Sequence, residues 1–452
     1  MIGHSFKSRF YSLLIMTKEM NNPSGGNSRR DFLKKSALAA AAIASGPSLF
    51  KNSLYSAAPA AGSVLGANDQ IRVGFIGVGG QGFGTHVRTL AANAAAWNVK
   101  GVAVCDVWSA RVDRALNHLG LPASDGYEDY RELLERDDVD AVYIGTVDHW
   151  HAKIAIDALD AGKHVFCEKP FTRYLDEAFE VYDAVKRSGK VFALGTHWTS
   201  QAHWHKAGEL VREGRIGPLV LAETSFARNN PNGEWNYRID PALTPDAVNW
   251  QKWLGPVSDR PFDADAFFRW RKYYPYCSGI LGDLLSHKLH PLMIATNTYE
   301  FPYRVACLGS REITPDRDVT DTTQFMTQFE NGLQMLIIGS TVNEVGLREI
   351  IRGHKATLYL GGGAVELRPE RPFADEIDPE EFGGLVDENH HKNWFDSIRG
   401  EAEPNTGIEL AIRGQTIISM AEISERTGQM LYFDEKTRQM TDSSGKPVDP
   451  RV

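Results

Sequence analysis

The chain alternates between short apolar runs and longer amphipathic stretches over residues 71–194, and its pattern changes after Gly195. Apolar runs typical of buried strands cover 71–76, 99–105, 141–146, 164–167 and 191–194. Helical periodicity fills the stretches at 83–95, 149–161 and 175–188, with Asp148 expected to cap the second of these helices. Strands that alternate with helices in this way predict a parallel sheet with helices on both faces.

The second half of the chain follows a different pattern. Residues 229–276 are rich in Trp and Pro and show little periodicity, which in a compact protein is typical of a binding loop. A helix is predicted at 278–296, and the strand candidates around it indicate a largely antiparallel sheet. These candidates are 219–227, 303–309, 323–329, 333–340, 347–351, 356–360 and 365–368. Two last helices, at about 389–399 and 408–426, are expected to pack back onto the first half of the chain.

A glycine-rich turn, Gly77-Val78-Gly79-Gly80-Gln81-Gly82, joins the first strand to the first helix. Gly77 permits a tight turn, Gly79 lets the backbone approach a pyrophosphate, and Gly82 lets the helix and strand pack closely. Asp106 ends the second strand, 24 residues after Gly82, where a carboxylate can accept hydrogen bonds from ribose hydroxyls. A carboxylate there repels a 2′-phosphate, so the pattern favours NAD over NADP, and the nearby Arg111 weakens that preference.

The order strand, glycine turn, helix, strand and acid is that of a dinucleotide-binding Rossmann domain. The predicted fold class is α/β, with an N-terminal Rossmann domain built on a doubly wound parallel sheet. A C-terminal α/β domain with a large, mostly antiparallel open sheet follows. The predicted boundaries are a leader and linker at 1–69, the NAD(P)-binding domain at 70–195, and a substrate and oligomerisation domain at 196–452.

Composition and charge restrict the partners of this fold. Hydrophobic residues make up 42% of the chain and charged residues 24%, as in ordinary globular proteins. The net charge of -9 and the pI of about 5.9 argue against nucleic acid or an anionic membrane as the main partner. No stretch approaches the ~20 continuous apolar residues of a membrane-spanning helix.

An export signal is predicted near the N-terminus. Arg29 and Arg30 lie within Ser-Arg-Arg-Asp-Phe-Leu-Lys, an apolar run follows at 37–44, and a small-residue cleavage region lies at 56–62. This order resembles a twin-arginine leader and predicts a periplasmic or otherwise exported protein that folds before export. Folding in a reducing compartment favours free thiols at the four cysteines, Cys105, Cys167, Cys277 and Cys307.

The candidate chemistry is concentrated in two short motifs. Lys169, in Glu168-Lys169-Pro170, follows the strand at 164–167, and ligands bind outside the carboxyl ends of strands in doubly wound sheets. Asp283, His287 and His290 project from one face of the predicted helix at 278–296. A histidine with a pKa near neutrality can take the proton of an alcohol, and a carboxylate one turn away can bind a hydroxyl or orient the ring. Lys169 can donate to the oxygen that gains charge.

These motifs resemble the glucose–fructose oxidoreductase, inositol dehydrogenase and rhizopine-catabolism (Gfo/Idh/MocA) family over about residues 71–433. The matching elements are the glycine turn, Cys105-Asp106, Asp148-His149-Trp150-His151, Glu168-Lys169-Pro170 and the run from Asp283 to His287. The resemblance implies a bound nicotinamide, activity on hydroxyl or keto groups of sugars and cyclitols, and a C-terminal sheet that often forms a dimer face. It also implies Lys169, Asp283 and His287 as catalytic residues. The implied cofactor contacts are Gly77, Gly79, Gly82, Asp106, His151, Glu168 and Lys169.

Three positions depart from the family pattern. Thr146-Val147 replaces Thr-Pro, His290 stands where many members have an acid, and His197-Trp198 follows Thr196 where Gln or Arg is common. The departures indicate a pocket richer in imidazole and aromatic rings. These departures predict His197, Trp198 and His290 as substrate contacts, and Arg271 and Tyr274 are predicted hydroxyl contacts because they precede the catalytic helix. The spacing of His197, His203 and His205 fits no standard ligand pattern, so no metal is predicted, with a metal site left as a lesser option.

Three functions remain open at this point. The first is an exported, NAD-dependent oxidoreductase acting on a small carbohydrate or polyol, with the cofactor held tightly because no NADH pool exists outside the cytoplasm. The second is a redox-assisted glycoside hydrolase or lyase that forms a transient ketone, although relatives of that kind tend to lack the lysine of the Glu-Lys-Pro motif. The third is a non-enzymatic binding module on the same fold. The expected assembly is a homo-oligomer formed through the C-terminal sheet.

Overall fold

The structure, a computed structural model, describes residues 69–451. The predicted leader, its arginine pair and its cleavage region lie outside the described residues. Over residues 69–451, no helix is both long and apolar enough to cross a lipid bilayer.

The N-terminal part contains a six-stranded parallel sheet in the order β3-β2-β1-β4-β5-β6, which is the doubly wound order of a Rossmann domain. The predicted parallel sheet is therefore confirmed. Its strands are β1 (Ile71–Ile76), β2 (Val99–Cys105), β3 (Gly126–Tyr127), β4 (Ala141–Ile144), β5 (His164–Cys167) and β6 (Phe192–Leu194). All four residues of β4 and of β5 are buried, as expected for strands covered on both faces. The helices of this part are α2 (Arg88–Trp97), α3 (Ser109–Leu119), α4 (Tyr130–Leu134), α5 (Asp148–Asp160) and α6 (Leu175–Ser188).

The C-terminal part is built on a large sheet in which β7 and β10 are the parallel pair and the other described pairs are antiparallel. This confirms the predicted, mostly antiparallel open sheet. Its first strands are β7 (Leu219–Asn229), β8 (Arg304–Ser310), β9 (Thr322–Gln328), β10 (Gln334–Ser340) and β11 (Val342–Asn343). Its later strands are β12 (Glu349–Gly353), β13 (Ala356–Gly361), β14 (Ala364–Pro369), β15 (Glu380–Phe382), β16 (Leu431–Asp434) and β17 (Gln439–Thr441).

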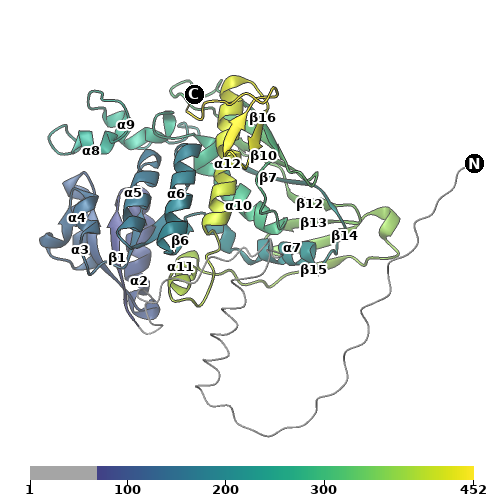
Figure 1. Cartoon of the computed structure of the whole chain (residues 1–452), viewed down its shortest axis with the longest axis horizontal. Helices are drawn as coiled ribbons and strands as arrows, with labels where there is room; N and C mark the ends of the chain where they lie inside the picture. Colours follow the sequence, from purple (N-terminus) through teal and green to yellow (C-terminus); the bar gives the residue numbers. More distant parts are fainter. Residues whose placement is uncertain (1–68, 452) are drawn as a thin grey trace, which may run out of the picture. The chain divides into compact units, whose positions relative to one another are not determined.

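One face of this sheet is covered and the other is open. Burial alternates along β9 and β10, so every second side chain points into the core. The covering helices are α7 (Ala202–Arg212), α10 (Ser286–Ala295) and α12 (Ile408–Thr427). In Figure 1, α12 stands between the two sheets, and it packs against both α6 and β8. Alternating strands thus place one apolar face on a helical layer that the two parts share.

The penultimate helix returns to the first sheet. Three side chains of α11 (His390–Ile398), namely Trp394, Phe395 and Ile398, are buried in one hydrophobic cluster with residues of β1, β2 and β4. Asn389 begins this helix, because its side chain accepts the backbone N–H groups of His391 and Lys392. The packing of α11 agrees with the expectation that the last helices fold back onto the Rossmann domain.

The structure differs from the sequence predictions at two helix starts. Asp148 is the first residue of α5 and not its cap, because Val147 holds the extended cap position. The predicted helix at 278–296 is a π-helical turn, η5 (Leu281–Leu285), followed by α10. Another π-helical turn, η1 (Gly82–Val87), follows the glycine loop. Both π-turns carry site residues, which agrees with the general association of π-turns with functional sites.

Candidate active site

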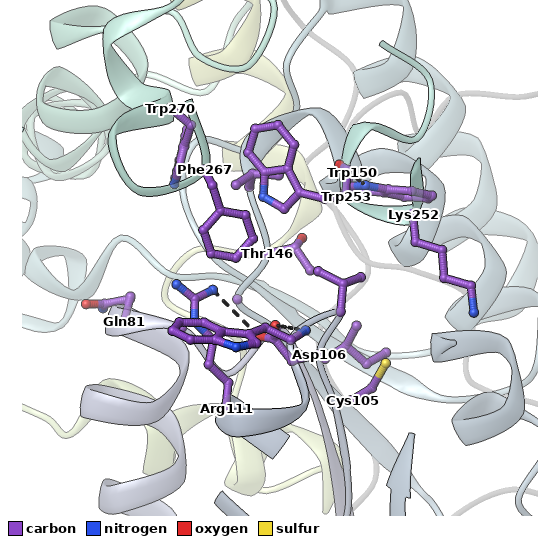
Figure 2. Close-up of a pocket in the computed structure, with 18 of the residues that line it drawn as sticks. Gln81, Cys105, Asp106, Arg111, Thr146, Trp150, Lys252, Trp253, Phe267 and Trp270 are labelled. Atoms are coloured by element: carbon purple, nitrogen blue, oxygen red, sulfur yellow. Dashed lines mark hydrogen bonds and ion pairs between the residues drawn. The ribbon is translucent and has the colours of Figure 1, made fainter. Parts of the chain in front are cut away.

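A cavity of about 760 Å³ lies along the carboxyl ends of β1, β2, β4 and β5. It extends from the glycine loop and Asp106 to Thr146, Lys169 and Arg271. Figure 2 shows its aromatic side, where Trp253, Phe267 and Trp270 lie across the cavity from Asp106 and Arg111. A cavity of this size, at the place where ligands bind in doubly wound sheets, is the candidate cofactor and substrate pocket.

The glycine loop has the shape that a pyrophosphate needs. Gly77 has a φ of 81°, and a Cβ there would come within 2.6 Å of the Thr146 nitrogen. A Cβ on Gly82 would meet the Gly77 carbonyl oxygen at 1.9 Å, so no larger residue fits there. Thr146 Oγ1 is buried and has no hydrogen-bond partner among the described residues. A tight backbone cradle beside an unpaired hydroxyl fits the phosphates and ribose of a dinucleotide.

Asp106 lies at the carboxyl end of β2, where the sequence placed it. Its Oδ2 accepts the Val78 N–H at 2.9 Å, and its Oδ1 accepts the Trp108 N–H at 3.1 Å. The guanidinium of Arg111 lies 3.9 Å from Oδ2. The carboxylate is thus fixed beside the glycine loop, with further acceptor capacity for a ribose hydroxyl.

Glu168 is buried behind the glycine loop. Its Oε1 accepts a hydrogen bond from Gln81 Nε2 at 3.0 Å and lies 3.1 Å from His86 Nε2 and 3.8 Å from His197 Nε2. Burial opposes ionisation, but the neighbouring His197 and His86 more than offset it and hold the pKa of Glu168 well below its usual range. The predicted cofactor contact is therefore an ionised carboxylate, held in position by its imidazole and amide neighbours.

His151 supports the pocket from behind and is not one of its lining residues. It is buried, with Nδ1 2.8 Å from the Pro170 carbonyl oxygen and Nε2 3.3 Å from that of Thr146. Burial lowers the pKa of His151, so the ring is neutral. The ring lies between the loop after β5 and the loop after β4, and as a neutral imidazole it can donate to only one of these two carbonyl oxygens.

Lys169 and Asp283, two of the predicted catalytic residues, lie in direct contact. Lys169 Nζ donates to Asp283 Oδ1 at 2.5 Å and to the Asp283 carbonyl oxygen at 2.9 Å. Arg271 Nε donates to the same Oδ1 at 2.7 Å, and Trp235 Nε1 donates to Oδ2 at 2.9 Å. Burial alone would raise the pKa of Asp283, but the cations of Arg271 and Lys169 hold it well below its usual range. Asp283 is therefore a permanent anion that fixes two cations at the inner end of the pocket.

The expected pairing of Asp283 with His287 is absent among the described residues. The hydrogen bonds to Asp283 come from Lys169, Arg271 and Trp235, and His287 Nδ1 is buried without a partner. The π-turn gives the physical reason, because it changes the angle per residue and turns Asp283 out of the α-helical i, i+4 register. Of the two roles that the sequence left open for this carboxylate, binding a hydroxyl or orienting the ring, the second has no hydrogen bond to support it among the described residues.

His287 is a neutral imidazole. Burial, reinforced by the charge of Lys169, lowers its pKa to about 3, where the sequence had suggested a value near neutrality. The ring of Trp198 lies beside it, with centroids 5.4 Å apart, and Trp198 also stacks on Phe226. The ring is unprotonated and its Nδ1 has no partner among the described residues, but the burial and the Lys169 charge that lower its pKa also make it a weaker base.

The other predicted substrate contacts fall in different places. Arg271 lines the pocket and His197 lies beside Glu168, whereas Trp198 lies beside His287. Tyr274 lies away from the pocket, with its ring under Arg426 and its carbonyl oxygen accepting from Arg173 Nε at 2.8 Å.

His290 also lies away from the pocket. It is buried between α10 and α12, where a Cβ on Gly414 would come within 2.2 Å of its Nε2. Its Nδ1 lies 2.9 Å from the Ser286 carbonyl oxygen. Both His290 and Tyr274 therefore serve packing in this structure.

Asp148 is a pocket residue that the sequence suggested only as a helix cap. It lines the cavity, it is 1% exposed, and neither carboxylate oxygen meets an N–H or O–H donor among the described residues. Burial raises its pKa to about 7, although the charge of Arg271 acts in the opposite direction, and the Cys277 thiol lies alongside. The sequence did not indicate that Asp148 lines the pocket, because its place at the start of a helix is also that of a cap and the sequence does not show where the side chain points.

A pH series of unfolding free energies tests this state of Asp148. A pKa raised from 3.8 to about 7 gives stability that is fully present below about pH 4 and is lost as the pH rises through about 7. The unfolding free energy of the wild type is therefore expected to fall between acid and mildly alkaline pH, and Asp148→Asn should make that fall smaller by up to about 4 kcal/mol. Glu425, whose pKa burial also raises to about 7, provides a comparator outside the pocket. Glu425→Gln should likewise reduce the loss of unfolding free energy that the wild type shows as the pH rises. If the unfolding free energy of Asp148→Asn depends on pH as strongly as that of the wild type, the raised pKa of Asp148 is contradicted.

The cysteines and histidines give no further chemistry. All four cysteines are buried free thiols, as predicted. Within residues 69–451, no group of three or more His, Cys, Asp or Glu side chains is arranged to hold a metal ion.

Both parts of the chain match one known family. Residues 71–196 match the Gfo/Idh/MocA oxidoreductase family through its NAD-binding Rossmann fold, and residues 220–447 match its C-terminal alpha/beta domain. Among curated proteins, a glycosyl hydrolase family 109 protein of Shewanella baltica is 34% identical over 215 residues, 44% of this chain and 45% of that protein. An α-N-acetylgalactosaminidase of Shewanella oneidensis is 32% identical over 233 residues, 46% of this chain and 49% of that protein. The matches thus span just under half the length of these relatives.

Solved structures share the fold at lower identity. The aldose-aldose oxidoreductase of Caulobacter crescentus, complexed with glycerol, has a TM-score of 0.63 at 19% identity, over 80% of this chain and 100% of that one. A levoglucosan dehydrogenase in complex with NADH and levoglucosan has a TM-score of 0.61 at 19% identity, over 80% of this chain and 99% of that one. The two family matches together cover most of the sequence and agree with both described sheets. The chain belongs to the Gfo/Idh/MocA oxidoreductase family.

Proposed function

We propose that this protein oxidises a hydroxyl group of a sugar, polyol or sugar derivative, using a bound nicotinamide dinucleotide. One observation carries the proposal. Lys169 and Arg271, which both line the pocket, share the Asp283 carboxylate, and the charge of Lys169 acts on the neutral ring of His287. Cations fixed in a buried site stabilise an alcohol oxygen as it gains negative charge, and they need no rearrangement during the reaction.

Each group has a distinct part in this reaction. The nicotinamide, when bound, accepts the hydride from the carbon of the alcohol. Lys169 donates a hydrogen bond to the substrate oxygen, and His287 takes the hydroxyl proton, so the alcohol becomes a ketone with loss of one hydride and one proton. Asp283 stays ionised and keeps Lys169 in place. Trp198 stands beside His287, with its ring stacked on Phe226 and Lys288 Nζ 4.4 Å from its centroid, so it borders this group without lining the pocket.

NAD is the proposed cofactor, held tightly enough to be reduced and reoxidised in place. Asp106 is fixed at the end of β2, where its charge repels a 2′-phosphate. Arg111 lies 3.9 Å from that carboxylate. The carboxylate partly neutralises the guanidinium, so Arg111 attracts a 2′-phosphate less strongly. The nucleotide released by denaturing the purified protein identifies the cofactor by mass.

A second candidate function is redox-assisted cleavage of a glycoside. Oxidation of a ring hydroxyl acidifies the neighbouring C–H, so the glycosidic oxygen leaves by elimination. Addition of water and return of the hydride then give no net oxidation. Such a sequence needs more acid and base groups than a simple oxidation, and Asp148, with a pKa of about 7, is one more such group in the pocket. The names of the family 109 relatives also favour this candidate.

One experiment separates the two candidates. The NAD-loaded protein is incubated with a panel of free sugars, polyols and aryl glycosides that includes N-acetyl-α-galactosaminides, while NADH absorbance and released aglycone are followed. Accumulation of NADH with an oxidised sugar is the result expected for the oxidoreductase. Aglycone release with NAD still oxidised would replace it with the second candidate. Neither signal over the whole panel would contradict both.

Export by the twin-arginine route is proposed from the sequence between Ser28 and Ala44. The pair Arg29→Lys/Arg30→Lys is expected to leave the protein in the cytoplasmic fraction of its host. Equal amounts of both forms in the periplasm would contradict this route.

A homo-oligomer is proposed through the open face of the C-terminal sheet. Large apolar side chains are exposed there at Leu308 on β8 and Met326 on β9, 67% and 44% exposed respectively. They are neighbours in the β8–β9 pairing, where Ala306 pairs with Met326 and Leu308 pairs with Gln324. Light scattering of wild type and of Leu308→Lys/Met326→Lys measures this, and a wild-type monomer would contradict it.

A further inference from the structure

Residues 240–270 of the C-terminal part, here called the covering segment, cross over three successive loops of the Rossmann sheet. At the loop after β2, Val248 forms an antiparallel bridge with Trp108, and the Asn249 N–H donates to the Val107 carbonyl oxygen at 3.0 Å. At the loop after β3, Asn249 Nδ2 donates to Glu128 Oε1 at 2.7 Å, and Lys252 Nζ lies 3.1 Å from the same oxygen. The segment is thus attached beside the end of β2, where Asp106 lies.

The third attachment is at the start of α5. The Trp253 carbonyl oxygen accepts the Trp150 Nε1–H at 2.9 Å and lies 3.0 Å from His149 Nε2. The backbone passes so close to Trp150 that a Cβ on Gly255, whose φ is 52°, would lie 2.3 Å from the indole ring. A glycine is needed at this position for both the close approach and the positive φ.

Between these attachments, the covering segment presents aromatic side chains to the pocket. Trp253, Phe267 and Phe268 line it, and Trp253 and Phe267 are buried in one apolar cluster with Trp108 and Val147 of the Rossmann part. The Arg111 guanidinium lies 4.7 Å from the ring centroid of Phe267 and 5.3 Å from that of Trp108. Figure 2 shows Phe267 next to the Arg111 guanidinium, with Trp253 on the same aromatic side of the pocket. The half of the pocket around Asp106 therefore has one wall from each part of the chain.

We propose that the covering segment completes the adenosine half of the cofactor site and must detach before NAD can enter or leave. The inference rests on the proposed function for NAD binding itself. A dinucleotide whose ribose reaches Asp106 and whose phosphates reach the glycine loop lies between the two walls. Its exit requires loss of the Val248–Trp108 bridge and of the Asn249 and Lys252 contacts with Glu128. The cofactor consequently stays bound through many catalytic cycles, as a fixed prosthetic group does.

Exchange of bound NAD tests the covering segment directly. The full-length protein is loaded with radiolabelled NAD, chased with excess unlabelled NAD, and sampled over time by rapid gel filtration. Wild type is expected to keep its label with a half-time of ~hours. Asn249→Ala/Lys252→Ala removes the contacts with Glu128 but no backbone bond of the bridge. It is expected to speed both association and dissociation by about tenfold or more, with a smaller change in Kd, because a detached cover opens the way in both directions.

The control removes an equivalent ion pair elsewhere in the Rossmann part. Lys153→Ala breaks the exposed pair of Lys153 with Asp157 on α5 and should leave both rates unchanged. Exchange of the wild-type label within seconds, or equal rates in wild type and the double variant, would overturn the role of the covering segment and leave the proposed function standing. A variant that only dissociates faster would show a loss of direct contact and no cover. No binding of NAD by wild type would overturn both proposals.

Discussion

Lys169→Met is expected to lower kcat/KM by about three orders of magnitude or more while the protein stays folded and binds NAD. The ammonium group is held at 2.5 Å from Asp283 Oδ1 in the wall of the pocket, where it meets the substrate oxygen under the proposed function. Methionine keeps most of the apolar stem and removes only the charge. Asp283 still has Arg271 and Trp235 as partners, so no buried anion is left without a donor. Steady-state kinetics and the NAD content of the variant measure the two effects separately.

Two comparisons make the result specific. Lys163 is a second buried lysine of the Rossmann part, and its Nζ donates to the Arg136 carbonyl oxygen outside the pocket, so Lys163→Met should keep turnover. Asp283→Asn leaves the buried charges of Lys169 and Arg271 facing a neutral amide, so it should lose both turnover and stability. Activity of Lys169→Met within tenfold of wild type would contradict the assigned role of the lysine.

The position of Lys169 could be predicted because it depends on local sequence. The run at 164–167 is apolar enough to be a buried strand, which places Lys169 at a carboxyl strand end. The glycine turn and Asp106 are likewise fixed by the short pattern around them. The resemblance to the family then indicated that these motifs belong to one site. The two sheets confirm the predicted fold class.

The parts that could not be predicted depend on packing between distant residues. Nothing in the sequence signals that η5 is a π-turn, so the sequence does not show that Asp283 lacks a hydrogen bond to His287 on its own helix. Its true partners, Arg271 and Trp235, come from a segment without periodicity, where pattern analysis gives no orientation. The burial of Asp148 results from a wall supplied by the other half of the chain. Each of these features requires the tertiary contact itself to be known.

Arg173→Leu is expected to destabilise the protein by about 3 kcal/mol or more. Arg173 is buried, and its two Nη atoms donate to the two Glu422 oxygens at 2.8 Å each, while its Nε donates to the Tyr274 carbonyl oxygen. The side chain thus joins the loop after Lys169, the loop before η5, and α12. Its loss leaves Glu422 buried, and within residues 69–451 the cation that remains paired with it is the Arg426 guanidinium at 3.6 Å. Urea unfolding of the single variant measures the cost.

The double variant Arg173→Leu/Glu422→Leu shows why Arg173→Leu is less stable. The loss of stability comes either from the buried, unpaired charge of Glu422 or from the lost connection between segments. Removing both charges leaves two apolar side chains of similar reach in an apolar setting, and such replacements of buried pairs are often close to neutral. The double variant should therefore recover most of the stability that Arg173→Leu loses, with a coupling free energy of about 2 kcal/mol. Its turnover should stay low if the guanidinium also aligns the loops that carry Lys169 and Arg271, because leucines cannot restore the bond to the Tyr274 carbonyl oxygen. Stability and turnover that recover together would instead assign Arg173 to stability alone.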